Sequence, residues 1–128
     1  MNQLENNDIK FWIEDGILFS EFKSPIVLAI EHSKAIVAMR HEISNNEKQY
    51  WCYSLYNVKS YTKESRDYAE KYGQDFLHAT AVVVTSHLTI FIFNAFQKLN
   101  RPKIPLRAFK NREDAVTWLK ELKQQNEK

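Results

Sequence analysis

TAVVVTSHLTIFIFNAFQKL, residues 80–99, is the most apolar stretch of this chain. A membrane-spanning helix needs about 20 nearly continuous apolar residues, and a polar Thr-Ser-His triplet at 85–87 interrupts this one. The β-branched run at 82–84 is typical of a strand that is buried on both faces. Ser86 can cap a helix that runs from about residue 87 to residue 99. The stretch therefore predicts a strand, a corner and a helix, without a membrane span.

The predicted helix has apolar residues on two sides. One face repeats with helical spacing and is expected to cover the sheet; it comprises Leu88, Phe91, Ile92, Ala95 and Leu99. Ile90 and Phe93 project from the opposite side, beside Gln97. Either a second helix or a partner molecule covers these two residues. Because exposed apolar patches usually mark contacts, we expect a homodimer whose interface includes Ile90 and Phe93.

The rest of the chain alternates strands and helices. The expected elements, in chain order, are a hairpin that turns at Asp15-Gly16, a helix over about Ile30 to Ser44, a strand over Tyr50 to Leu55, a helix capped by Thr62 and ended by a left-handed Gly73, the 80–99 stretch, the strand LRAF, and a last helix capped by Asn111. The order ββαβαβαβα predicts an α/β domain with a mixed, mostly parallel sheet and about four helices. We expect this domain to span residues 9–124, with flexible ends at 1–8 and 125–128.

The corners between strands and helices define a candidate binding site. In a parallel sheet these corners lie along the carboxyl edge, the usual binding edge of open α/β folds. Three segments are expected there: Asn57–Thr62, Thr85–His87 and Lys110–Arg112. The candidate residues for a ligand or partner are Asn57, Ser60, Thr62, Thr85, Ser86, His87 and Arg112. Helix N-termini favour an anion or a partner's carboxylate, although helix capping alone also explains the Ser, Thr and Asn residues.

Composition excludes several function classes. The chain has 128 residues and a net charge of +2, with basic residues interspersed among acids, which disfavours nucleic-acid binding. Cys52 is the only cysteine, so no intrachain disulfide can form. The first ten residues, MNQLENNDIK, lack the pattern of a signal peptide. We therefore expect a cytoplasmic protein.

The sequence contains no recognisable catalytic or metal-binding set. Its two glycines, Gly16 and Gly73, cannot build a phosphate-binding or dinucleotide-binding loop, and the four histidines include no pair with metal-ligand spacing on a helix. Cys52 lies in a predicted strand, where a free cysteine commonly acts as a small buried hydrophobe. His32, on an apolar helix face, is interpreted as a core histidine with its hydrogen bonds satisfied. We expect no enzyme activity, no metal and no cofactor.

Three features together resemble the small bacterial SpoIIAA-like proteins of the STAS-domain group. They are the element order, the closing segment IPLRAFKNREDAVTWLKEL, and the segment TAVVVTSHLTIFIFNAFQKLNRPKIP. The resemblance covers about Ile9 to Leu122, and its most telling piece is FKNREDAVTWL. It implies a non-enzymatic protein-interaction module of bacterial origin.

The resemblance also places a regulatory turn on this chain. Anti-anti-sigma members switch partners through a phosphorylated serine in an Asp-Ser-Ser-Gly turn, which corresponds here to Thr62-Lys63-Glu64-Ser65 in LYNVKSYTKESRDYA. This turn lacks the Asp and the Gly, so the phosphoswitch signature is degenerate, and Thr62 and Ser60 remain as weak candidate acceptors. Other relatives of the fold hold lipids or nucleotides. The alternative function is therefore a carrier of a small apolar or anionic ligand, with a pocket at the same carboxyl edge.

Overall fold

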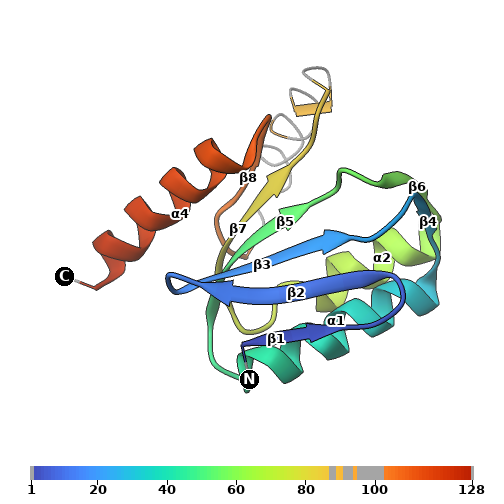
Figure 1. The fold of residues 1–128 in the computed structure, drawn as a ribbon, viewed down its shortest axis with the longest axis horizontal. Helices are drawn as coiled ribbons and strands as arrows, with labels where there is room; N and C mark the ends of the chain where they lie inside the picture. Colours follow the sequence, from blue (N-terminus) through green and yellow to red (C-terminus); the bar gives the residue numbers. More distant parts are fainter. Residues whose placement is uncertain (1, 87–88, 91–93, 95–102, 128) are drawn as a thin grey trace.

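The computed structural model describes residues 2–86, 89–90, 94 and 103–127 (Figure 1). Six strands form the main sheet in the order β1-β2-β3-β5-β7-β8. Their bounds are β1 Gln3–Glu5, β2 Ile9–Glu14, β3 Ile17–Phe22, β5 Gln49–Ser54, β7 Leu77–Val83 and β8 Leu106–Phe109. The pairs β3–β5, β5–β7 and β7–β8 are parallel, while β1–β2 and β2–β3 are antiparallel. This confirms the α/β fold with a mixed, mostly parallel sheet and an N-terminal hairpin.

The hairpin turns where the sequence predicted. Asp15 and Gly16 have φ angles of 53° and 76°, the left-handed conformation that a two-residue hairpin turn requires. One strand was not predicted: Gln3–Glu5, within the segment expected to be flexible, pairs with β2 as β1. That expectation is corrected for residues 3–5, because a three-residue strand carries too little periodicity to be recognised before its partner is known.

A second, two-stranded sheet was also missed. The strands β4 (Ile26–Leu28) and β6 (Val58–Tyr61) pair in parallel beyond the ends of β3 and β5. The predicted order ββαβαβαβα therefore lacks three strands that the structure contains, β1, β4 and β6. Both strands of this sheet are brief, and each depends on a partner about 30 residues away, so local pattern alone does not reveal them.

Three helices have bounds within the described residues: α1 Ile30–Ser44, α2 Lys63–Tyr72 and α4 Arg112–Asn126. The predicted caps are confirmed, since the Thr62 hydroxyl accepts from the Ser65 N–H at 3.1 Å and the Asn111 side chain accepts from the Asp114 N–H at 2.8 Å. Gly73 ends α2 as expected. However, its φ of −81° and ψ of −1° are right-handed, so the left-handed cap was wrong.

The described part of the 80–99 stretch fits the predicted corner. β7 continues to Val83, and Thr89, Ile90 and Asn94 are helical. The Ser86 hydroxyl accepts from the Thr89 N–H at 3.3 Å, as a helix cap does. The remainder of the predicted 87–99 helix lies outside the described residues. No helix within the described ranges is long and apolar enough to cross a membrane.

The two faces of the main sheet carry separate apolar clusters. On one face α1 packs over β2, β3 and β5, through residues that include Ile36, Ile43 and Trp51. On the other face α4 packs through Ala115 and Leu119. α1 and α2 lie side by side (Figure 1), and the hydroxyls of Ser33 and Ser65 hydrogen-bond across their contact. This arrangement leaves the carboxyl ends of β3, β5, β7 and β8 along one edge.

Candidate functional site

A groove of about 500 Å³ lies at this carboxyl edge. The ends of β3, β5, β7 and β8 and the first residue of α4 form its walls. Its lining residues are Glu21, Phe22, Ser54, Tyr56, Asn57, Val83, Thr85, Lys110 and Arg112. The groove therefore combines aromatic, amide, acidic and basic groups within one open depression, which we call the rim groove.

Arg112 forms one wall of the rim groove and contacts both an acidic and two aromatic side chains. Its Nη2 donates to Glu21 Oε2 at 3.0 Å, and both side chains are about half exposed. The guanidinium carbon lies 5.4 Å from the ring centre of Trp12 and 5.8 Å from that of Phe19. An exposed ion pair adds little stability, whereas stacking on aromatic rings restrains the guanidinium plane. The arrangement holds a basic group at the mouth of the groove.

Asn57 fixes the opposite wall. Its Nδ2 donates to the main-chain oxygen of Phe22 at 2.8 Å, which ties the turn after β5 to the end of β3. The neighbouring Tyr56 is 74% exposed, the highest value among the large hydrophobic side chains that the structure describes as exposed. A turn that is hydrogen-bonded to the end of β3 thus presents a solvent-exposed aromatic ring beside the polar groups of the groove.

The structure brings three of the predicted site residues together. Asn57, Thr85 and Arg112 all line the rim groove. Ser86 is exposed and caps the residues that follow it. His87 lies outside the described residues, so the prediction for it stays open.

Two predicted residues lie apart from the groove lining. Ser60 is an exposed residue of β6, paired with Val27, and Thr62 is the half-buried cap of α2. The last residue of the degenerate turn, Ser65, is buried against Ser33. Among these hydroxyls, that of Ser60 is the one on an exposed residue, and phosphorylation there stays a prediction.

Ile90 was expected to project from the helix into an exposed apolar patch, and the structure shows otherwise. It is half-buried and packs against a small cluster of Val82, Val84 and Ala108. The strand ends and the residues after the corner approach each other closely, which the helical wheel alone could not reveal. Phe93 lies outside the described residues, and the homodimer stays a prediction.

Sequence reasoning missed Glu21 and Tyr56. β3 was interpreted as part of an antiparallel hairpin edge, yet its parallel pairing with β5 places the end of β3 on the same edge as the other strands. Tyr56 was missed because an aromatic residue after an aromatic strand suggests burial, and its 74% exposure follows from the turn that Asn57 holds. The available signal was its position directly before a predicted rim residue.

Cys52 is a free cysteine within β5, in a buried position where a cysteine is ordinarily unreactive. Cys52 is buried, and burial raises the pKa of its thiol to about 11, with Arg112 acting in the opposite direction. His32 Nδ1 accepts from the Ala29 N–H at 2.9 Å, so this histidine has a structural hydrogen bond, but it is half-buried and does not occupy the core position that was predicted. Within the described residues, no three His, Cys, Asp or Glu side chains gather into a group that could hold a metal ion.

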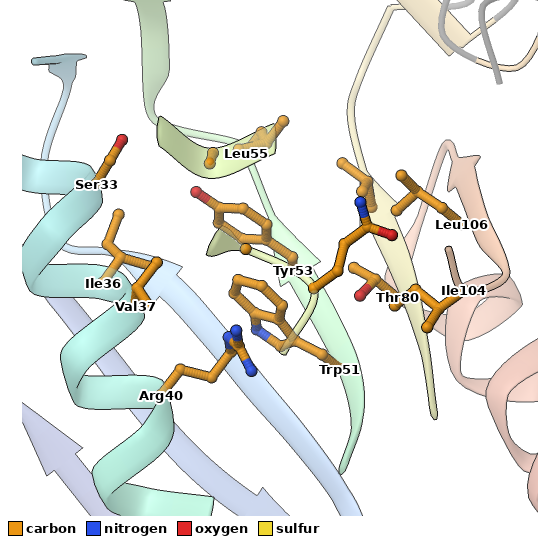
Figure 2. A pocket seen from close by; sticks show the side chains of 14 residues that line it. Ser33, Ile36, Val37, Arg40, Trp51, Tyr53, Leu55, Thr80, Ile104 and Leu106 are labelled. Carbon is orange, nitrogen blue, oxygen red and sulfur yellow. The ribbon is translucent and has the colours of Figure 1, made fainter. Parts of the chain in front are cut away.

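A second cavity, of about 230 Å³, lies against the sheet face that α1 covers (Figure 2). Figure 2 shows three of its sides: α1 with Ile36 and Arg40, the stacked rings of Trp51 and Tyr53 on β5, and residues of β7 and β8 that include Leu106. We call it the face pocket. Its walls are mainly aliphatic and aromatic, and Arg40 is its one charged lining residue among those described.

A family model described as "Domain of unknown function (DUF7793)" matches residues 11–123. The chain belongs to this family. The DUF7793 match begins within β2 and ends within α4, so the lining residues of both the rim groove and the face pocket fall within it.

The fold of this DUF7793 chain is similar to that of a solved structure. It is the crystal structure of an uncharacterized protein from the DUF3478 family with a SpoIIAA-like fold, from Shewanella loihica PV-4. The TM-score is 0.68 with 12% sequence identity, over 91% of this chain and 97% of that chain. The chain therefore has a SpoIIAA-like fold, as its sequence resemblance implied. No curated protein matches it.

Proposed function

We propose that this protein is a non-enzymatic interaction module that binds a partner polypeptide at the rim groove. The observation that carries the proposal is the exposed Tyr56 beside the restrained guanidinium of Arg112, on an edge held by Asn57. Tyrosine and arginine are the residue types that most often dominate binding energy at protein interfaces. Here they stand on short turns anchored to a sheet, so little ordering cost accompanies binding.

The chemistry of the groove suggests what the partner presents. Lys110 and Arg112 lie on one side and Glu21 pairs with Arg112 there. A partner carboxylate can compete for the guanidinium, since Arg binds carboxylates through two parallel hydrogen bonds. An apolar or aromatic partner side chain would cover Tyr56. We therefore favour a partner segment with an acidic residue next to an apolar one.

Site-specific photo-crosslinking tests the proposal. A benzophenone amino acid replaces Tyr56 in one protein and Tyr72 in a matched control, because Tyr72 is also an exposed tyrosine but lies on α2 outside the groove lining. We expect a discrete crosslinked polypeptide from position 56 in the source cell and none from position 72. Adding Arg112→Glu to the position-56 protein should abolish the crosslink, because like charges then oppose the partner carboxylate.

The result can also contradict the proposal. Identical crosslinked species from both positions would indicate non-specific contact. A crosslink from position 56 that survives Arg112→Glu would separate the aromatic contact from the proposed recognition of a carboxylate. No crosslink from either position would overturn the rim groove as the interaction site.

A further inference from the structure

Arg40 is the most unusual residue of the fold. It lies on α1 with 0% of its surface exposed, and it is the largest fully buried side chain among those described. Its Nη1 donates to the main-chain oxygen of Asp75 at 2.6 Å. Its Nε and Nη2 have no hydrogen-bond partner among the described residues. Buried arginines are ordinarily paired, so two open donors at one buried group require an explanation.

The surroundings of the guanidinium do not neutralise its charge. Across the described ranges, no carboxylate lies within ion-pair distance of Arg40. The guanidinium carbon instead lies 5.2 Å from the ring centre of Trp51. Burial lowers the pKa of Arg40 to about 10, and the charge of Asp75 acts in the opposite direction. The side chain thus remains a cation at neutral pH inside an apolar wall.

The open donors define a binding geometry. Nε and Nη2 form one edge of the planar guanidinium, and this edge can donate two parallel hydrogen bonds to a carboxylate. Arg40 lines the face pocket together with Trp51, Tyr53 and Ile36, and Figure 2 shows the guanidinium next to Trp51 at the lower end of this group. Both nitrogens are closed to solvent in this conformation, so a head group reaches this edge when the side chains around Arg40 shift, and the rest of its molecule then lies among aliphatic and aromatic side chains.

We propose that the face pocket binds a small apolar monocarboxylate, with Arg40 donating to the carboxylate through Nε and Nη2 and the apolar body lying over Trp51 and Tyr53. A single buried cation balances a single negative charge, whereas a phosphate monoester would bring up to two and leave uncompensated charge in an apolar site. The proposal concerns a site separate from the rim groove and stands independently of the proposed function.

The volume limits the ligand. A cavity of roughly 150 Å³ accommodates benzene, and the face pocket measures about 230 Å³. The pocket therefore suits a short aliphatic chain or a single aromatic ring that carries a carboxylate, and is small for a long-chain lipid. Octanoate is a probe of this size and chemistry, and 1-octanol is its uncharged counterpart with the same apolar chain.

Isothermal titration of the full-length protein tests the proposal. The variants are Arg40→Met, which keeps an unbranched, flexible apolar stem but is shorter and removes the charge and the donors, and Arg66→Met, a matched control on the exposed side of α2. We expect octanoate to bind the wild type and Arg66→Met equally. Arg40→Met should weaken this binding by at least about tenfold, the loss expected for a charge-assisted bidentate pair. In the wild type, 1-octanol should bind at least about tenfold more weakly than octanoate for the same reason.

A second measurement covers the case in which Arg40→Met fails to fold. Octanoate should shift the indole N–H resonance of Trp51, which lines the pocket, while that of Trp118 on the opposite sheet face stays unchanged. Any one of four results would overturn the proposal: the wild type does not bind octanoate, Arg40→Met binds it as tightly as the wild type, 1-octanol binds as tightly as octanoate, or the Trp51 resonance does not shift. Loss of the Tyr56 crosslink would not bear on this proposal, because the rim groove is a separate site.

Discussion

The thiol of Cys52 offers a sharp test of how tightly the sheet is enclosed. Cys52 is 2% exposed and packs with Phe19, Ala81 and Leu119 on the sheet face that α4 covers. Burial raises its pKa from 9.0 to about 11. Near pH 8 the thiolate fraction therefore falls from about one in ten to about one in a thousand. Because the thiolate is the reacting species, we expect labelling of the native protein to be at least about 100-fold slower than labelling of the unfolded protein.

The labelling assay needs a control of equal thiol content. A double variant, Cys52→Ala with Ser60→Cys, carries one thiol on the exposed strand β6 instead. With a chromogenic disulfide reagent, this thiol should react at nearly the rate of the unfolded chain. Rapid labelling of native wild-type Cys52 near neutral pH, at a rate similar to that of the control, would refute the enclosed sheet. It would also reopen a nucleophilic role for Cys52.

The same pKa shift predicts how stability depends on pH. The unfolded thiol loses its proton near pH 9 and the folded thiol near pH 11. Between these values the folded state binds more protons, so this thiol's contribution to the unfolding free energy falls as pH rises. Two pKa units correspond to roughly 3 kcal/mol. We expect the unfolding free energies of wild type and Cys52→Ala, measured with denaturant and plotted against pH, to run parallel below about pH 8 and to converge or cross above it. Plots that stay parallel up to pH 11 would contradict the pKa shift.

Two further predictions concern the helices. Ser65→Glu should lower the melting temperature strongly, since it buries an unpaired carboxylate at a position that is 2% exposed. The control Ser65→Ala should lower the unfolding free energy by about 1 kcal/mol or less, because the Ser33 hydroxyl keeps the main-chain oxygen of residue 65 as its acceptor. A Ser65→Glu protein as stable as the alanine control would show that α1 and α2 are not packed as described. Asn111→Ala should cost about 1 kcal/mol through loss of the α4 cap, whereas Asn111→Ser should restore most of it, both measured by urea unfolding; equal losses would exclude capping as the cause.

Features that depend on near neighbours could be predicted from the sequence. The Asp15-Gly16 turn, the bounds Ile30–Ser44 of α1, and the caps Thr62 and Asn111 all follow from residues within one turn of each other. The torsions of this turn and the capping hydrogen bonds are local, so the amino acids that make them were sufficient evidence, whereas the torsions of Gly73 were not predicted correctly. The order of the main strands and helices followed from periodicity in the same way.

Features that depend on distant residues required the tertiary structure. The short strands β4 and β6 form only because each pairs with the other. Glu21 contacts Arg112 because β3 pairs in parallel with β5. Arg40 falls on the buried face of α1, but its charge suggests a surface position until Trp51 and Asp75 are seen to enclose it. The sequence by itself determined the longer strands and helices, the caps at Thr62 and Asn111, and the edge where a partner is expected. Only the packed fold decided which charges lie buried, because burial depends on residues that are far apart in the chain.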